Sequence, residues 1–488
     1  MISPRFIWGL FAPLSLYAIF ATVKQAIDLA TNGTSSLGTL AGAGVVLAVV
    51  ILLLRDAKWL ANISNSIANT VSTVPPRHWI AGCLLAGVVT RIVWVLLFPP
   101  VFVSDFKSYW QLANRLVDQG NFYIARTYAY WPPGLPFSLV PSLLALGSHP
   151  WVPFVNNLLL FGGTLIVVYF LAATVSDEIV ARVATILLAL WPNFIFYAGL
   201  PGKELLLAFL LPLAILLYLS CAAPDARSSR PIFALLTGLV LGFATLTQAS
   251  VILYPSVLII YEIIRRTAVR TLLSRISLVI LGIVLMVSPW TVRNYFVLDT
   301  FVPVSTNGGW SFYAGNNPKA TGGYVALEAD FADYDEVTAS KLAFSRGKSW
   351  IKENPLKFAE LAIKKNLIFL GEDSDGVFWT VKRGWGIDDF RYAMLKALSN
   401  LFWIGIFVLS LVSLRLRWES LSNFPEIALL TLGFLYFFAI HSVFESGSRH
   451  HVAMIGCLAI LAALAFDLRP MKAINSCNTR PDNTEPTV

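Results

Sequence analysis

Long apolar stretches, separated by short polar ones, occupy most of the chain. An α-helix rises about 1.5 Å per residue, so about 20 consecutive apolar residues cross the hydrocarbon core of a bilayer. On this rule the sequence predicts an all-α polytopic membrane protein with about 12 transmembrane helices, interfacial helices and a mixed outer loop region. The predicted spans are residues 6–23, 37–54, 79–98, 151–174, 180–200, 204–222, 232–248, 251–264, 276–290, 397–414, 427–444 and 452–466.

The composition supports a lipid environment. Of the 488 residues, 57% are hydrophobic and only 13% are charged, whereas a soluble domain carries about 25% charged residues. The four cysteines have the spacing of neither a metal site nor a disulfide framework, and we interpret them as inert small hydrophobic residues. The first apolar stretch is long for a signal-peptide core, so we expect it to be retained as a span.

The positively charged residues predict the orientation in the membrane. If the N-terminus is cytoplasmic, the short outer loops carry little more than Lys24, Lys203 and Arg449. We therefore predict a multi-pass protein of the plasma (inner) membrane with both termini cytoplasmic. This topology accounts for the net charge of +8, so no nucleic-acid partner is expected. The inner loops carry Arg55, Lys58, Arg77, Arg182, Arg227, Arg230, Arg265, Arg266, Arg270, Arg275, Arg415, Arg417, Arg469, Lys472 and Arg480.

Two outer segments are too long to be simple turns, and function concentrates in such loops. The second of them contains helical patterns at 339–350 and 355–370. The chain is accordingly divided into two additional N-terminal transmembrane helices (1–78), a transmembrane core (79–290) with the first outer loop (99–150), a large outer segment (291–396), C-terminal transmembrane helices (397–466) and a disordered cytoplasmic tail (467–488).

The first outer loop opens with an amphipathic helix that is expected to lie flat at the membrane surface. Gly120 ends this helix, and Asp105 stands at its start, at the level of the lipid headgroups. Asp105 either caps the helix or takes part in chemistry. The apolar stripe of the helix consists of Phe106, Tyr109, Trp110, Ala113, Leu116 and Val117.

A rigid turn follows in the same loop. Tyr130-Trp131-Pro132-Pro133-Gly134 precedes an apolar stretch that ends at Gly147 and is too short to span a membrane. Two prolines and a glycine return the chain to the membrane, so we expect a juxtamembrane or re-entrant helix here.

The order of these motifs, and their predicted side of the membrane, resemble a known family. Over residues 79–466 the chain resembles the C-superfamily glycosyltransferases that use polyprenyl-phosphate sugars, above all the protein-mannosyltransferase and aminoarabinose-transferase branch. Further matching stretches are Asn156-Asn157, Trp191-Pro192-Asn193 with Tyr197, Pro201-Gly202-Lys203-Glu204, Ser288-Pro289-Trp290-Thr291-Val292-Arg293-Asn294-Tyr295, Val302-Pro303-Val304-Ser305-Thr306-Asn307-Gly308-Gly309 and Gly315-Asn316-Asn317-Pro318.

The chain also departs from the family pattern. Asp105 stands alone beside Ser104, where the family often carries two adjacent acidic residues. Two spans precede the usual first span. The large outer segment lies between spans and is not the compact carbohydrate-binding domain of the eukaryotic mannosyltransferases.

The resemblance implies an integral membrane glycosyltransferase that acts at the outer membrane face. A sugar, hexosyl or pentosyl, would pass from a polyprenyl-phosphate carrier to a hydroxyl of a lipid, glycan or protein acceptor, with inversion. Asp105 matches the catalytic acidic residue, and a carboxylate there can accept the hydroxyl proton. Glu204 matches the second acidic position. No cofactor is required by the motifs; a divalent metal ion stays open, with Asp105 and Glu204 as its candidate ligands.

The leaving phosphate calls for positive charge at headgroup depth. Arg293 and Lys203 are the first candidates for donor binding, with Arg126 and Arg449 as weaker alternatives. Arg293 and Lys203 could instead place their charges at the interface without binding a ligand. Arg91 lies inside the third predicted span, where it lines a donor groove or forms a structural ion pair.

Two further clusters of polar residues lie at the outer face. Glu372, Asp373 and Asp375 form an acidic turn that binds a cation or an acceptor, or is simply solvated. The other cluster contains metal-ligand types, but adjacent histidines point in different directions on a helix, which disfavours one shared ion. Its members are His441, Glu445, His450 and His451.

Two other functions compete with sugar transfer. A transporter or lipid flippase usually shows two related halves, and the chain has no convincing internal repeat. A polysaccharide ligase or polymerase would also carry large outer loops, but without the early order of acidic residue, surface helix and Pro-Pro-Gly.

Overall fold

The computed structural model describes residues 3–30, 66–222, 230–327, 331–387, 389–418 and 424–466, with short pieces at 43–45, 47–48 and 51. Helices make up most of these residues. They contain no β-strand, and their β-structure is limited to an isolated bridge between Ile124 and Thr127. The predicted mixed outer region is therefore helix and loop in the part that is described.

Eight helical segments among the described residues are long and apolar enough to cross a membrane. They confirm the predicted class, an all-α polytopic membrane protein. The segments are α1 (Pro4–Ala30), α4 (Pro76–Leu97), α7 (Val152–Val175), α10 (Lys203–Ala222), α13 (Val269–Leu298), α18 (Asp389–Arg417), α19 (Pro425–Val443) and the continuous run of η5 (Ser448–Met454), α20 (Ile455–Ala463) and η6 (Leu464–Phe466).

Of the other four predicted spans, one lies largely outside the described residues, and three form shorter or broken apolar helices. The prediction for 37–54 falls largely outside the described residues. The stretch 180–200 is broken into α8 (Glu178–Ala189) and α9 (Pro192–Phe196), because Pro192 cannot continue the preceding helix. The last two predicted spans correspond to α11 (Pro231–Thr247), which has 17 residues, and to the pair η1 (Ala249–Leu253) and α12 (Pro255–Ile264). Gln248, in an extended conformation, separates α11 from η1.

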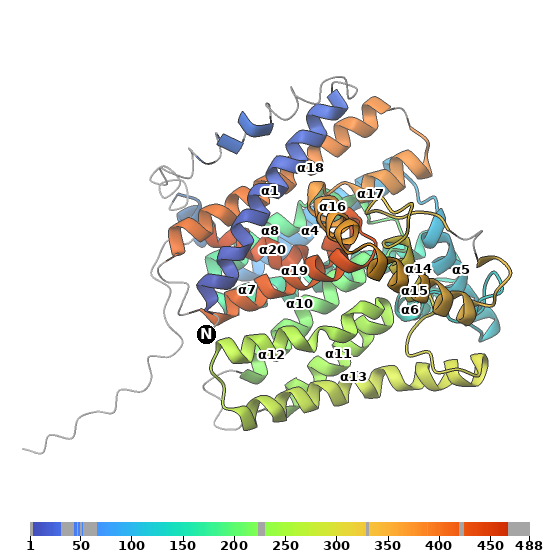
Figure 1. Cartoon of the computed structure of the whole chain (residues 1–488). Helices are drawn as coiled ribbons and strands as arrows, with labels where there is room; N and C mark the ends of the chain where they lie inside the picture. Colours follow the sequence, from blue (N-terminus) through green and yellow to red (C-terminus); the bar gives the residue numbers. More distant parts are fainter. Residues whose placement is uncertain are drawn as a thin grey trace, which may run out of the picture.

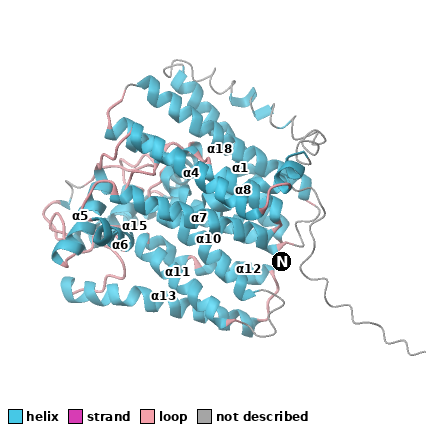
Figure 2. Cartoon of the chain, turned by 180° about the vertical axis from the view of Figure 1, so that it is seen from behind, coloured by secondary structure: helices cyan, strands magenta, loops and turns pink. Residues whose placement is uncertain are grey.

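The helices of the two long outer segments gather at one end of the bundle. Figure 1 shows α5 (Ser104–Gln119), α6 (Gly134–Leu146), α14 (Gly308–Ala314) and α15 (Glu336–Glu353) together at this end, while the chain starts at the other end. The view from behind in Figure 2 gives the same arrangement for α5, α6 and α15. Helix α16 (Pro355–Gly371) packs against the spans α1 and α19.

The predicted surface helix of the first loop is present as α5. Of the predicted stripe, Phe106, Tyr109 and Ala113 are buried, together with Leu112, so this face packs against the protein and not against lipid as expected. Trp110, Leu116 and Val117 are half-buried. Gly120 ends the helix in the left-handed conformation, with φ of 63°, which glycine adopts without steric cost.

Side-chain amides of the sequence motifs hold the outer loops in place. Asn157 donates to the carbonyl oxygens of Ala198 and Leu200, just before α10. Asn294 donates to the carbonyl oxygens of Val302 and Val304 in the large outer segment. These buried amides replace the backbone hydrogen bonds that irregular segments lack.

Gly134 of the Pro-Pro-Gly turn lets α6 approach α11 without a gap. A Cβ atom at this position would lie 2.7 Å from the backbone nitrogen and 2.8 Å from the Cα of Thr247. Backbone atoms cannot yield in the way that the end of a flexible side chain can. The turn therefore needs glycine for its packing and not only for its shape.

We expect Gly134→Ala to lower the stability of the protein by about 1–3 kcal/mol, because one added methyl group overpacks this contact. The measurement is the midpoint of thermal unfolding in detergent. Gly82→Ala is the matched control, because a Cβ there meets no atom within 4 Å. Equal midpoints for the two variants would contradict the account of this turn.

Candidate active site

Arg449 lies at the centre of a cluster of carboxylates at the end of the bundle that carries α5. It belongs to η5, and its Nη1 atom lies 3.6 Å from Oδ2 of Asp105. The side chain of Arg449 is 21% exposed and that of Asp105 is 42% exposed, so the pair is open to solvent. The carboxylates of Glu204, Asp375 and Glu445 also interact electrostatically with this guanidinium.

A residue of the same loop holds the carboxylate of Asp105 in place. The indole nitrogen of Trp131 donates to its Oδ1 atom at 3.3 Å, which ties the Tyr-Trp-Pro-Pro-Gly turn to the start of α5. The preceding residue, Ser104, has φ of 52°, a conformation that costs a non-glycine residue of order 1–3 kcal/mol. Such strain persists where the surroundings fix the chain, and it is common at active sites.

Glu204 lies at the start of α10 beside Lys203. It is 4% exposed, and its Oε2 atom has no hydrogen-bond partner among the described residues. A buried carboxylate oxygen without a donor is costly, so a substrate hydroxyl or a water is the natural partner here. Lys203 is half-buried and interacts electrostatically with Asp105, Glu204 and Glu445.

Asp375 completes the cluster from the large outer segment. Its Oδ2 atom accepts hydrogen bonds from the hydroxyl of Tyr197 at 2.7 Å and from the indole of Trp379 at 2.9 Å. Burial raises the pKa of this carboxyl from 3.8 to about 6; Glu204 adds to the increase, while Arg449 and the Tyr197 hydroxyl oppose it. Asp375 therefore changes its charge close to neutral pH.

Tyr109 lies below these acidic residues on the buried face of α5. Burial, together with the charges of Asp105 and Glu204, raises the pKa of its hydroxyl well above 10.0. The phenol therefore stays neutral near neutral pH and adds no negative charge to the cluster.

The residues predicted for the site fall into two groups. The structure brings Asp105, Lys203 and Glu204 together with Arg449. It places the other three predicted donor-binding residues elsewhere, as follows.

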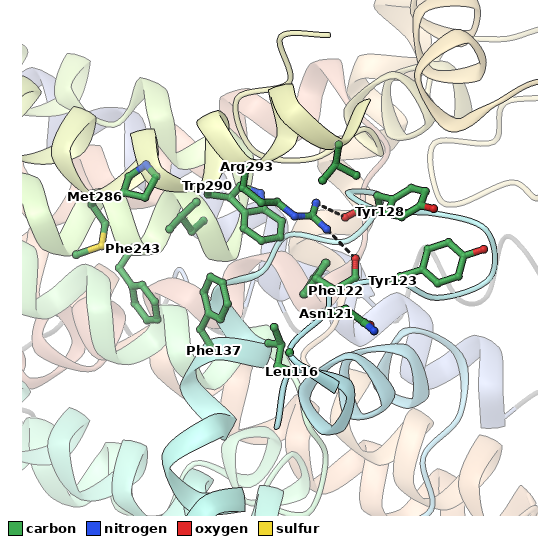
Figure 3. Close-up of a pocket in the computed structure, with 14 residues that line it drawn as sticks. Leu116, Asn121, Phe122, Tyr123, Tyr128, Phe137, Phe243, Met286, Trp290 and Arg293 are labelled. Carbon is green, nitrogen blue, oxygen red and sulfur yellow. Dashed lines mark hydrogen bonds between the residues drawn. The ribbon is translucent and has the colours of Figure 1, made fainter. Parts of the chain in front are cut away.

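Arg293 lies in α13 at an apolar cavity of about 700 Å³ (Figure 3). Its guanidinium stacks over Trp290 at 4.7 Å and donates to the carbonyl oxygens of Tyr128, at 2.7 Å, and Phe122, at 3.0 Å. The cavity also touches Leu116, near the end of α5. Leu116 is eleven residues from Asp105, about 16 Å along the helix.

Arg126 is exposed in the loop that follows α5, in a turn with positive φ values at Ala125 and Arg126. Arg91 is 1% exposed within α4. One of its nitrogens donates to the carbonyl oxygens of Gly87 and Ala189, and its guanidinium lies 3.7 Å from the centre of the Phe161 ring. In the described residues, Arg91 is thus held by backbone oxygens and aromatic rings, and its predicted ion pair is not formed.

The donor set of the site does not fit a metal ion. In the part of the chain that the structure describes, no three histidine, cysteine, aspartate or glutamate side chains form a group that could hold one. The candidate ligands Asp105 and Glu204 interact instead with the guanidinium of Arg449, whose Nη1 atom lies 3.6 Å from Oδ2 of Asp105 and whose charge acts on Glu204.

Sequence reasoning gave too little weight to two of the central residues. The sequence favours Arg293 over Arg449, because nothing in the pattern shows that the start of the last span meets the first loop. The sequence groups Asp375 with its acidic neighbours. In the structure, the hydroxyl of Tyr197, which belongs to one of the motifs, donates a hydrogen bond to Asp375 and so distinguishes it from them. That motif was the available signal, since its aromatic and amide donors imply an acidic partner.

Comparisons with known proteins give likenesses in three dimensions only. No protein-family model matches the chain, and no curated protein sequence matches it. It is similar to a crystal structure of the oligosaccharyltransferase of Archaeoglobus fulgidus, at 14% identity and a TM-score of 0.48, over 80% of this chain and 50% of the other. The chain thus spans about half the length of that protein. A structure of the same oligosaccharyltransferase, AglB, with an inhibitory peptide and a dolichol-phosphate has a TM-score of 0.47, at 14% identity, over 80% of this chain and 50% of that one.

A further likeness is to ArnT from Cupriavidus metallidurans bound to undecaprenyl phosphate. The identity is 16% and the TM-score 0.42, and the match covers 80% of this chain and 77% of the other. At these identities the likeness concerns the arrangement of helices alone. The function is therefore argued below from the residues of this chain.

We expect the protonation of Asp375 to be visible directly. A carboxyl with a pKa of about 6 is protonated below that pH, so its carbonyl band in infrared difference spectra should decrease with a midpoint near pH 6 as the pH rises. Asp375→Asn should remove this component, and Asp118→Asn, at the exposed far end of α5, should not. A carboxyl component assigned to Asp375 that titrates near pH 4 would contradict the burial of this group.

Proposed function

We propose that the protein is an integral membrane glycosyltransferase that moves a sugar from a polyprenyl-phosphate carrier to an acceptor hydroxyl, with inversion. The observation that carries the proposal is the convergence of Asp105, Glu204 and Arg449 from three distant segments into one partly open cluster. The choice of carrier follows from the motifs that resemble the C-superfamily. The acceptor class, lipid, glycan or protein, is left to experiment.

In this proposal Asp105 acts as the general base. It is partly exposed, and both of its oxygens have neighbours that orient the carboxylate without burying it. It accepts the proton of the acceptor hydroxyl as that oxygen attacks the anomeric carbon, and the bond from that carbon to the carrier phosphate breaks. General-base assistance of this kind contributes about 10²–10⁴-fold to a rate. Glu204, with its unpaired oxygen, orients the acceptor.

Arg449 and Lys203 are the proposed partners of the leaving phosphate. Both cations lie in the same cluster as the base, and guanidinium geometry suits two phosphate oxygens at once. The contact of 3.6 Å between Arg449 and Asp105 is longer than a good charged hydrogen bond, so the guanidinium can turn toward a phosphate without losing a strong partner. The phosphate carries negative charge away from the sugar, and the two cations stabilise it.

The apolar cavity beside Arg293 is proposed to hold part of the carrier's hydrocarbon chain. It is lined by aromatic and aliphatic side chains, among them Phe137, Phe243 and Met286 (Figure 3). A separation of about 16 Å along α5 suits a long polyprenyl chain whose headgroup lies at Asp105. Arg293 then stabilises the wall of the cavity through the loop carbonyls and does not bind the reacting phosphate.

The proposal includes a position in the cell. The positive-inside pattern places the cluster on the extracytoplasmic face of the plasma (inner) membrane, with both termini in the cytoplasm. The gathering of the long outer segments at the end opposite the start of α1 supports this arrangement (Figure 1).

The first test is release and transfer of sugar from radiolabelled polyprenyl-phosphate sugars by purified protein in detergent or proteoliposomes. We expect Asp105→Asn to lower turnover about 10²–10⁴-fold, because the amide cannot take the proton. Asp118→Asn on the same helix is the control and should keep wild-type turnover.

Full turnover by a folded Asp105→Asn variant would remove the proposed base. Absence of transfer with every donor, combined with movement of the carrier across proteoliposome membranes, would favour a transporter or flippase. Extension of a polymer that is already linked to lipid would favour a polysaccharide ligase or polymerase.

A second test addresses the cavity. Met286→Trp should fill it and raise the KM for a donor with a long polyprenyl chain about tenfold, while a donor with a short, water-soluble chain is used as before. Leu285→Trp is the matched control, because Leu285 is its neighbour in α13 and is 52% exposed. Equal effects of Met286→Trp on long and short donors would contradict a role in binding the chain.

A further inference from the structure

Two pairs of residues each have one member in η5 and the other in the acidic turn that leads into α17 (Asp375–Val377). Arg449 interacts electrostatically with Asp375, and His451, two residues further on, contacts Asp373, two residues earlier. Arg449 and Asp375 face the open cluster. His451 and Asp373 lie in the closed interior, both with no exposed side-chain surface. The same two segments thus carry one pair in the site and another in the interior.

Asp373 is saturated with hydrogen bonds. Its Oδ2 atom accepts from the indole of Trp191 at 2.6 Å, and its Oδ1 atom accepts from the amide of Asn193 and lies 3.0 Å from Nε2 of His451. Its backbone nitrogen donates to Oδ1 of Asn400 at 3.0 Å. The carboxylate is therefore closed to any acceptor or cation, unlike Asp375 two residues later.

His451 is fixed on both sides of its ring. Its Nδ1 atom lies 2.7 Å from the carbonyl oxygen of Phe369, which can only accept, so this nitrogen carries a hydrogen. The hydrogen bond between Nε2 of His451 and Oδ1 of Asp373 then needs one further proton, which belongs to one of these two groups. The ring also stacks on Trp403 at 4.2 Å and 17°, and the Trp403 indole donates to the carbonyl oxygen of Leu370.

These contacts determine where Asp375 and Arg449 can be. His451 and Asp373 are 78 residues apart in the sequence, and breaking their contact would free the acidic turn and η5 to move relative to each other. Displacements of about 1 Å in a reacting group can cost about 100-fold in rate. Asn193 adds to the anchoring, because its Oδ1 atom accepts from the backbone nitrogen of Gly376 at 2.8 Å.

We propose that His451 and Asp373 are positioning residues, which set the register between Arg449 and the acidic turn and thereby the geometry of the reacting cluster. This inference rests on the proposed glycosyl transfer for its effect on rate. Its structural part, the distance between the two segments, can be tested without any activity.

The kinetic test is a double-mutant cycle. His451→Gln should lower kcat about 10–100-fold with less than a threefold change in KM, because binding contacts remain while alignment is lost. In an Arg449→Gln background, where the aligned group is already gone, the same substitution should change kcat less than threefold. Leu458→Ala is the structural control: it opens the buried core of α20, and its effect should be the same in both backgrounds.

The structural test uses cysteines at positions 375 and 449 and a short bifunctional thiol cross-linker. We expect the cross-linking yield to fall severalfold when His451→Gln is added, and not when Leu458→Ala is added. If His451→Gln does not fold, Trp191→Phe replaces it in both tests, since it removes one donor to Asp373 and keeps an aromatic ring.

The outcomes separate the two proposals. Equal losses of kcat from His451→Gln in the two backgrounds, or an unchanged cross-linking yield, would overturn the positioning role. A wild-type protein that transfers no sugar but shows cross-linking that depends on His451 would support the positioning role and refute the proposed reaction.

Discussion

The end of the bundle that carries α5 depends on how the charge of Arg449 is neutralised. A guanidinium at the start of the last span is costly unless carboxylates surround it. No single segment supplies them: Asp105 comes from the first outer loop, Glu204 from the start of α10, and Asp375 from the large outer segment. The charge of Arg449 is met by three distant segments that come together in a single cluster, and this cluster has the composition that the proposed sugar transfer requires.

The site has an open and a closed level. The open level contains the partly exposed side chains of Asp105 and Arg449, and beside them the buried carboxylate of Glu204, whose Oε2 atom has no hydrogen-bond partner among the described residues. The closed level contains Asp373, His451 and Trp403, each with its polar atoms paired and its surface buried. Reactive groups can remain unpaired because the residues beneath them are saturated and rigid. The same division explains why two neighbouring aspartates of one turn have different tasks.

Much of the fold was predictable because it follows from local patterns. Apolar stretches of sufficient length gave eight of the spans, and the stripe ending at Gly120 gave α5. The break at Pro192 was missed, because hydropathy alone does not register a helix that ends inside an apolar stretch. Asp105, Lys203 and Glu204 were identified from their motifs, and the structure brings them together. The partnership of Arg449 with Asp105 spans more than 300 residues, and no local pattern contains it.

The most direct measurement is a structure of the protein with a polyprenyl phosphate bound in a lipid nanodisc. Our account predicts phosphate oxygens within hydrogen-bond distance of Arg449 and Lys203, beside the carboxylate of Asp105, with the hydrocarbon chain in the cavity near Trp290. A phosphate held by Arg293 at the apolar cavity, with none at Arg449 and Lys203, would contradict it.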